Sequence, residues 1–535
     1  MEGHNVKNHL SAKRNPHLAP FSLFEEQHAT TAYDFIIIGA GSAGCIVASN
    51  LAANFPDKTI LLVEAGPPIQ STNQTVWDPT QWALVSQDSS LEWGYQSTPQ
   101  AGLANRVIPM GRAKGLGGCS IHNAMVYVRG GKKGYDHWAK EGNAGWDYDS
   151  VLPYFKEVEA KMRINIIPDS KDPFIGDLIH ACNNKNLPFN SNYNEITDIP
   201  CVSFMQFSIA SDKRETTASV FLSGLPSNLT IVTNQLVEKI VIDKASKTAK
   251  SIVISSAAGT TQTEVSANNE IILSAGAIGS PHILMLSGIG HQDELTQAGI
   301  DPIQHLAGVG KNFQDDLYVT TWFKSKKPMP SQPYGLMGSI IFDNSPYNNA
   351  SLGTDIECSL AAGTMVGLNL PPDKQQSWLI YPNIQLLKSR GTVTLASYKP
   401  SDAPIIDPNY LSDPSDIKNC VSAVKLALSI GEDSGLANWY DETLLPASTS
   451  DLEDYVRASA GTCYHYAGTC KMGPATDSMA VVTPDLKVIG INNLRVIDSS
   501  VIPTTVSGNT AGATMMIAQK GSAMVSSQQI KSSPS

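Results

Sequence analysis

Residues 33–66 read YDFIIIGAGSAGCIVASNLAANFPDKTILLVEAG, and this stretch decides the fold. The apolar run from Phe35 to Ile38 is typical of a strand buried on both faces of a parallel sheet. A G-x-G-x-x-G pattern follows it, then apolar residues at helical intervals, then a second apolar strand that ends at Glu64. This strand, turn, helix and strand predict a Rossmann-type unit that binds a dinucleotide.

Three glycines of the pattern each have a physical role in that prediction. Gly39 permits the tight turn, and Gly41 has no side chain to keep a pyrophosphate from the backbone. Gly44 lets the helix pack closely on the strand. Ser42 and Ala43 lie at the start of the helix, whose free N–H groups and positive dipole end favour phosphate.

Glu64 follows Gly44 by about 20 residues, the spacing at which a carboxylate accepts hydrogen bonds from the adenosine ribose. A carboxylate there also repels a 2′-phosphate, so NADP is not expected. Ala65 continues this contact. The pattern alone does not separate FAD from NAD.

The composition excludes several classes of protein. The chain has 535 residues, of which 42% are hydrophobic and 16% charged, as in a soluble enzyme with more than one domain. Its net charge of -11 argues against a nucleic-acid partner, which needs a basic face. The sequence has neither an apolar secretion signal nor a run long enough to span a bilayer, so a cytoplasmic protein without a membrane span is expected. Its eight cysteines form no CxxC pair, which predicts neither a metal site nor disulfides.

Five further stretches carry a family resemblance: 111–130 (GRAKGLGGCSIHNAMVYVRG), 276–290 (GAIGSPHILMLSGIG), 308–316 (GVGKNFQDD), 464–473 (YHYAGTCKMG) and 494–520 (LRVIDSSVIPTTVSGNTAGATMMIAQK). In order and spacing they resemble the signatures of the glucose-methanol-choline (GMC) oxidoreductases. The resemblance runs from Tyr33 to Val525 and implies FAD as the cofactor.

The resemblance also implies an α/β fold with two domains. A Rossmann-type FAD-binding domain is expected from residues 30–160, 201–311 and 464–530. An α+β substrate domain on an antiparallel sheet is expected from 161–200 and 312–463, and the alternating TVTLAS at 392–397 favours such a sheet. Residues 1–29 and 531–535 are expected to be poorly structured tails.

A general base is needed because an alcohol that gives up a hydride must also lose its hydroxyl proton, and histidine has the right intrinsic pKa. The resemblance places the catalytic histidine at His465. It places a partner that shares the substrate oxygen at Asn509, whose amide both donates and accepts hydrogen bonds. For His137, His180, His282, His291 and His305 we favour structural roles.

The segment around His122 departs from the usual family pattern. It reads GGCSIHN, which resembles the choline-oxidase-like members, in which this histidine is joined to the 8α-methyl group of the flavin. Two interpretations stay open: FAD bonded covalently to His122, or a histidine that only touches the cofactor. A second departure is Asp316, which stands where the family usually has His and leaves the packing of that loop open.

The resemblance implies further cofactor contacts. Arg112 is either a phosphate partner or a charge at the rim. The others are Gly117, Gly118, Asn123, Ala124, Met125 and Val126 near the pyrophosphate and flavin edge, Val237 at adenine, Asp498 and Ser499 at the ribityl–pyrophosphate region, and Thr510 at the pyrimidine end.

The expected activity is oxidation of a primary or secondary alcohol to a carbonyl by hydride transfer to FAD, with oxygen or another electron acceptor. The alternatives are a hydroxynitrile-lyase-like or photodecarboxylase reaction on the same scaffold, and a flavin-binding protein without catalysis. The particular alcohol is not readable from the sequence. Glu357 is either a carboxylate inside the pocket, where it would suit an ammonium group, or a residue that faces solvent.

Overall fold

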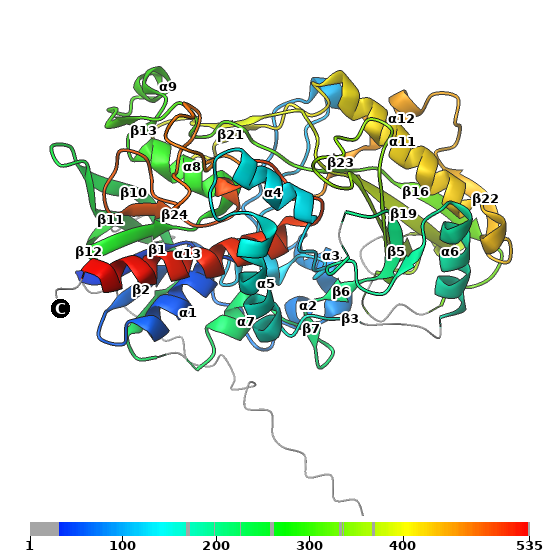
Figure 1. Cartoon of the computed structure of the whole chain (residues 1–535), viewed down its shortest axis with the longest axis horizontal. Coiled ribbons are helices and arrows are strands. Elements are labelled where there is room, and N and C mark those ends of the chain that lie inside the picture. Colours follow the sequence, from blue (N-terminus) through cyan, green and yellow to red (C-terminus); the bar gives the residue numbers. More distant parts are fainter. Residues whose placement is uncertain are drawn as a thin grey trace, which may run out of the picture.

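Two large sheets lie at opposite ends of the molecule (Figure 1). The computed structural model describes residues 31–166, 172–196, 198–224, 226–256, 262–330, 334, 336–365 and 370–532. The predicted tails 1–29 and 531–535 therefore lie outside the described residues, except for the last residues of the C-terminal helix.

The first sheet is the predicted Rossmann unit with additions. Its strand order is β10-β11-β12-β1-β2-β9, with β24 added beside β12. β1 runs parallel to β2 with Phe35 opposite Ile60 and Ile38 opposite Val63, which confirms both predicted strands. Every residue from Phe35 to Ile38 and from Ile60 to Val63 is buried, because helices cover both faces of the sheet. The strands are β1 (Ala32–Ile38), β2 (Ile60–Val63), β9 (Leu229–Val232), β10 (Gln235–Asp243), β11 (Thr248–Ser256), β12 (Gln262–Leu273) and β24 (Leu494–Val496).

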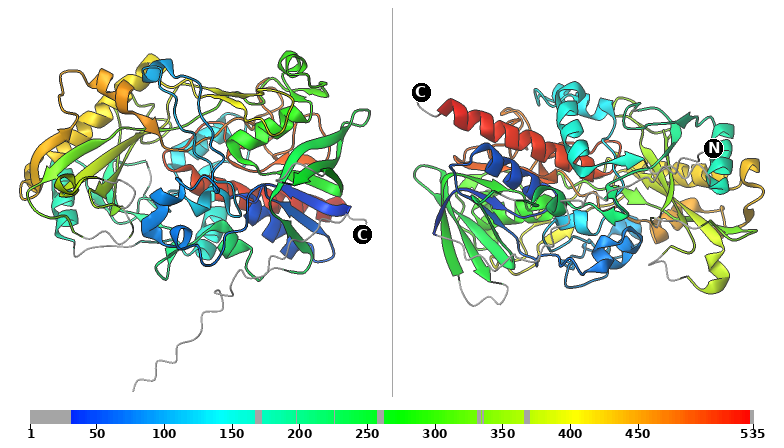
Figure 2. Two further views of the ribbon diagram at one scale, coloured as in Figure 1. Left: turned by 180° about the vertical axis from the view of Figure 1, so that it is seen from behind. Right: turned by 90° about the horizontal axis from the view of Figure 1, so that it is seen from below.

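Two helices from opposite ends of the chain cover one face of this sheet. Seen from below, α1 lies between α13 and the strands (Figure 2), and α13 also packs on α5. On the other face α8 packs against β10. The helices around the sheet are α1 (Gly44–Asn54), α4 (Lys132–Lys140), α5 (Tyr148–Met162), α7 (Thr217–Phe221), α8 (Gly276–Leu286), α9 (Gln292–Gln297) and α13 (Thr510–Ser532).

The second sheet is almost wholly antiparallel and confirms the expected α+β architecture. Its order is β22-β16-β19-β18-β17-β5-β4, with β15 beside β19 and β23 beside β15. Helix α11 packs on β19, and α12 and α6 pack on α11. The elements are β4 (Phe189–Asn190), β5 (Cys201–Phe204), β15 (Leu317–Tyr318), β16 (Thr321–Ser325), β17 (Met337–Asp343), β18 (Ile356–Ala362), β19 (Ser377–Ile384), β22 (Tyr440–Leu445), β23 (Gly461–Thr462), α6 (Pro173–Asn184), α11 (Pro414–Gly431) and α12 (Leu452–Ser459).

Two details differ from the expectations. The alternating stretch 392–397 forms only the short strand β20 (Thr392–Thr394). This strand pairs with β21 (Ile405–Asp407) in a separate small sheet, and the N–H of Val393 donates to the carbonyl of Gly310, which belongs to neither large sheet. The strand β5 lies in the second sheet, although the predicted division gives residues 201–311 to the cofactor domain. The division into domains otherwise stays a prediction.

The remaining elements are short connections: α2 (Gln74–Trp77), η1 (Pro79–Gln81), α3 (Trp82–Val85), η2 (Ala101–Leu103), η3 (Gly118–Ile121), β3 (Asn165–Ile166), β6 (Gln206–Phe207), β7 (Ile209–Ala210), β8 (Lys213–Arg214), β13 (Ile289–Gly290), β14 (Gln304–His305), α10 (Pro372–Gln375), η4 (Ser434–Leu436) and η5 (Ser499–Val501). No helix in the described part of the chain is both long and apolar enough to traverse a bilayer.

Candidate active site

A glycine-lined cradle lies where β1 meets α1. Gly39 has φ +93°, a conformation that favours glycine, and a Cβ on Gly44 would lie 1.8 Å from the carbonyl oxygen of Gly39. A Cβ on Gly41 would approach only the Cα of Gly118, at 3.9 Å, and one on Gly276 would meet no atom within 4 Å. Helix α1 begins without a side-chain cap. An open backbone surface and an uncapped helix start fit a pyrophosphate.

A second glycine turn docks on the first. The N–H of Gly117 donates to the carbonyl of Ala40 at 2.8 Å, and a Cβ on Gly118 would lie 2.5 Å from the Cα of Gly41. The predicted cofactor loop from Gly117 onward is therefore in contact with the dinucleotide turn that includes Ser42 and Ala43. The two turns together form one cradle.

Glu64 is held at the end of β2 by backbone donors. Its Oε2 accepts from the N–H of Ala40 at 2.9 Å and its Oε1 from that of Gly66 at 2.8 Å. Burial raises the pKa of this carboxyl, and the two N–H groups oppose that effect. β10 begins here, since the N–H of Gln235 donates to the carbonyl of Glu64, so Val237 lies near the predicted adenosine end. Ala65 lies between Glu64 and Gly66 in the chain, and its contact with the cofactor stays a prediction.

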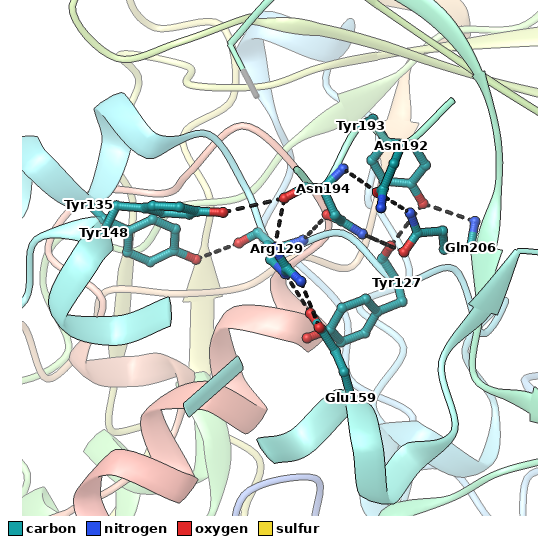
Figure 3. Close-up of polar contacts among 9 residues, drawn as sticks. All are labelled: Tyr127, Arg129, Tyr135, Tyr148, Glu159, Asn192, Tyr193, Asn194 and Gln206. Carbon is teal, nitrogen blue, oxygen red and sulfur yellow. Dashed lines mark hydrogen bonds and ion pairs between the residues drawn. The ribbon is translucent and has the colours of Figure 1, made fainter. Parts of the chain in front are cut away.

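A polar network holds the loop that contains Asn123, Ala124, Met125 and Val126. Figure 3 shows Arg129 joined to Glu159 of α5, at 2.5 and 2.7 Å, and to Asn194. The carbonyl of Tyr127 accepts from the hydroxyl of Tyr193 and the amide of Asn194. These bonds fix the loop between α5 and the region of the second sheet.

The predicted C-terminal contacts divide into backbone and side-chain roles. The carboxylate of Asp498 accepts from the N–H of Gly276 at 2.8 Å and from the hydroxyl of Ser280 at 2.6 Å. This side chain therefore holds the strand end and α8 together, and the contact of Asp498 and Ser499 with the cofactor stays a prediction. Thr510 starts α13 and is buried.

His465 lies at the centre of a mostly buried hydrogen-bonded chain. Its Nδ1 lies 2.9 Å from Oδ2 of Asp316, whose side chain has no exposed surface, and its Nε2 lies 3.2 Å from Nδ2 of Asn509. The structure thus brings together both predicted catalytic residues. Oδ1 of Asn509 is buried without a hydrogen-bond partner among the described residues. Although burial opposes it, the hydrogen bond and charge of Asp316 raise the pKa of His465.

The neighbouring carboxylate of Asp315 holds the same histidine by its backbone. Its Oδ1 accepts from the N–H of His465 at 2.8 Å, and its Oδ2 accepts from the hydroxyls of Tyr410 at 2.5 Å and Thr462 at 2.6 Å. Burial raises the pKa of Asp315 to about 6 in spite of these donors. Two consecutive aspartates therefore hold one histidine, one at its backbone and one at its ring.

His122 has a carboxylate partner of its own. Its Nδ1 lies 2.7 Å from Oε1 of Glu92, at ion-pair distance but out of line for a hydrogen bond. The thiol of Cys119 lies within reach of the same ring. Although burial alone would raise it, Arg112 and His122 lower the pKa of Cys119 to about 6. Burial lowers the pKa of His122, but Cys119 and Glu92 raise it, and the net result is a rise.

Arg112 connects the loops of the two histidines. Its backbone N–H donates to Glu92 at 2.8 Å, its guanidinium donates to the carbonyl of Tyr464, and it lies 4.2 Å from the centre of the Tyr466 ring. These contacts favour a tie between two loops over a phosphate partner or a rim charge. Its role toward the cofactor stays a prediction.

Glu357 is buried, which answers the question of its orientation. It lies in β18 and accepts from the amide of Gln385 at 2.8 Å, and its charge acts on His465. Burial raises its pKa to about 7.

Sequence reasoning missed several partners at the site. No motif surrounds Glu92, and the 308–316 stretch that contains Asp315 does not show that it bonds to His465, because each residue meets its histidine through the fold. Arg214, fully buried, donates to the carbonyl and side chain of Asn123 and was not expected either. Asp316 did carry a signal, its departure from the family pattern.

The glycine cradle, the carboxylate of Glu64 at the end of β2 and the paired histidine are together typical of a dinucleotide-dependent enzyme. Residues 33–318 and 388–518 match the GMC oxidoreductase family. The chain therefore belongs to the GMC oxidoreductases, as its motifs predict, and FAD is its cofactor.

Known proteins resemble this chain over nearly its full length. The alcohol dehydrogenase (acceptor) of Pseudomonas putida is 33% identical over 551 residues, covering 92% of this chain and 95% of that protein. The mitochondrial choline dehydrogenase of Mus musculus is 32% identical over 537 residues, covering 92% and 89%. The crystal structure of pyridoxine 4-oxidase from Mesorbium loti has a TM-score of 0.83 and 28% identity, covering 94% of this chain and 100% of that chain.

Proposed function

We propose that this GMC oxidoreductase oxidises a primary or secondary alcohol to a carbonyl compound, with His465 as the general base. One observation carries the proposal: His465 is bonded at both ring nitrogens, to Asp316 and to Asn509. A ring held in this way has a defined orientation and a defined site for a proton. The names of the relatives, an alcohol and a choline dehydrogenase, support the same donor class.

FAD supplies the hydride acceptor when it is bound. The chain's own residues bind the alcohol and remove its proton. On binding, the substrate hydroxyl takes the place of the Asn509 amide at the lone pair of Nε2 and donates to it, and Nδ2 of Asn509 donates to the substrate oxygen. As the carbinol carbon loses a hydride, His465 takes the hydroxyl proton, so the C–O bond becomes a carbonyl.

The residues proposed to hold FAD fit its chemistry. The backbone of Gly39, Gly41 and Gly44 would carry the pyrophosphate, and Glu64 the ribose hydroxyls. The loop that begins at Gly117 would meet the flavin edge. For His122 the GGCSIHN resemblance supports a bond to the 8α-methyl group, with Glu92 and Cys119 orienting the ring.

Anaerobic reduction of the holoenzyme tests the proposal. A panel of 1-butanol, 1-octanol, benzyl alcohol, choline and glucose is added without oxygen, and loss of the flavin absorbance is followed. At least one alcohol should bleach the flavin, and oxygen or a dye acceptor should restore the colour. A flavin that stays oxidised with every alcohol would favour a lyase, a photodecarboxylase or a protein without catalysis.

A further inference from the structure

Asp316 stands at a position where the family usually has histidine, and its surroundings are specific. It precedes β15 and is completely buried. One carboxylate oxygen lies 2.9 Å from Nδ1 of His465, and the other has no hydrogen-bond partner among the described residues. The ring of His465 is thus the one hydrogen-bond partner of this carboxylate among the described residues.

The two neighbours of the ring agree on where its proton sits. An ionised carboxylate only accepts hydrogen bonds, so Nδ1 of His465 must donate to Asp316. Nε2 of the neutral ring is then an acceptor, and the amide Nδ2 of Asn509 at 3.2 Å is a donor. Both contacts therefore select the same tautomer, with a lone pair on Nε2.

The charges around the ring explain why one carboxylate matters more than the others. Asp316 and Asp315 face His465 from the loop before β15, and Glu357 faces it from β18. Arg390 is the cation that acts on Asp316, and the Cys463 thiol adjoins the same group. Of the three carboxylates, only Asp316 touches the ring.

We propose that Asp316 is a positioning residue for the alcohol oxidation: it fixes the proton of His465 on Nδ1 and is the counter-ion of the imidazolium. The inference rests on the proposed function, in which Nε2 takes the hydroxyl proton as the hydride leaves the carbinol carbon. The proton thus ends on Nε2, and the positive charge that forms lies directly against the Asp316 carboxylate. A neutral histidine at this position would orient the ring but would not balance that charge.

The pH dependence of the reaction separates orientation from charge. The base works only when unprotonated, so kcat/KM rises with pH through the pKa of His465. Because Asp316 raises that pKa, its neutral replacement should move the acidic limb to lower pH. It should also lower the plateau of kcat/KM at least about tenfold, part of the ~10²–10⁴-fold that a positioned base supplies.

Four variants of the holoenzyme are compared with the fastest alcohol of the panel. Asp316→Asn and Asp316→His remove the charge, and both should move the acidic limb to lower pH. Asp316→Glu keeps the charge and should leave the limb close to that of the parent. Asp315→Asn, the matched control, removes a buried charge one residue away that does not touch the ring, so its limb should move less. FAD content and the thermal midpoint of each variant confirm folding.

The outcomes are distinct. If Asp316→Asn leaves the acidic limb in place, or if Asp315→Asn shifts it equally, the positioning role is wrong. That result is recognisable because His465→Ala would still be strongly impaired. If His465→Ala itself keeps its activity, the proposed function fails and the role of Asp316 fails with it.

Discussion

Two regions of the molecule present the same pair of groups, a mostly buried histidine with a carboxylate at Nδ1. At His465 the partner is Asp316, in line at 2.9 Å, and Nε2 meets an amide. At His122 the partner is Glu92, at 2.7 Å but out of line, and the ring also lies near a thiol. The first ring is thus bonded at both nitrogens, whereas the second is held by charge.

The comparison indicates that the surroundings of each histidine, and not its carboxylate partner alone, decide which chemistry the ring can perform. A ring whose Nε2 lone pair meets only an amide, which a substrate hydroxyl can displace, is suited to move a proton. A ring packed against a thiol of lowered pKa, in a loop docked on the cofactor cradle, is suited to contact or bond the flavin. The following predictions test whether the two regions are separate in function.

The largest effect is expected at His465. His465→Ala should retain FAD and lower kcat/KM for the best alcohol by roughly 10²-fold or more, because the general base is lost. The rate of anaerobic flavin reduction measures this. His180→Ala, on the exposed surface of α6, is the matched control and should behave like the parent. Equal losses in the two variants would remove His465 from the mechanism.

The next effect concerns retention of FAD. In a His122→Ala background, Glu64→Ala should weaken cofactor binding by about 1.5–3 kcal/mol, since charge-assisted hydrogen bonds to the ribose are lost. The FAD dissociation constant, measured by flavin fluorescence, should rise roughly tenfold to a hundredfold. An unchanged constant would show that Glu64 serves only the backbone of Ala40 and Gly66.

A smaller effect on rate, but a clear one on attachment, is expected at His122. Acid-denatured parent protein should keep its yellow flavin at the mass of the full chain, and His122→Asn should release free FAD while oxidation slows without being abolished. Glu92→Gln should slow the attachment. If the parent protein releases all its flavin in acid, His122 only contacts the cofactor without a covalent bond. The two histidines would then differ in that His465 transfers a proton and His122 packs on the flavin.

The smallest effect is expected at Glu357. Its charge raises the pKa of His465 less than that of Asp316 does, so Glu357→Gln should move the acidic limb of kcat/KM slightly to lower pH. Burial raises its own pKa to about 7, so the folded chain loses stability as pH rises from the ordinary glutamate range toward 7. Glu357→Gln should therefore raise Tm more at pH 8 than at pH 5. A limb shift larger than that of Asp316→Asn would make Glu357 the main electrostatic partner.

Much of the fold was predictable because its signals are local. The strands ending at Ile38 and Val63, and the glycines between them, follow from periodicity and turn chemistry over some 30 residues. The proposed catalytic pair could be predicted only through the family resemblance, since His465 and Asn509 meet across the fold.

The second partners of the histidines were not predictable in the same way. Glu92 reaches His122, and Asp315 reaches His465, through contacts between distant loops that leave no periodic mark. The small sheet at Thr392 shows the limit from the other side: a local alternation predicts a strand but not the sheet that receives it.

The place of β24 in the first sheet has a consequence for the making of the protein. This strand, which begins at Leu494, pairs in parallel with β12, and α13 behind it packs on α1 near the other end of the chain. During synthesis the core around the first sheet can therefore form completely only after β24 and α13 have been made. Such distant contacts predict slow folding and an early intermediate with an unpaired strand edge. A nascent chain stopped short of Leu494 should therefore bind chaperones, rather than FAD.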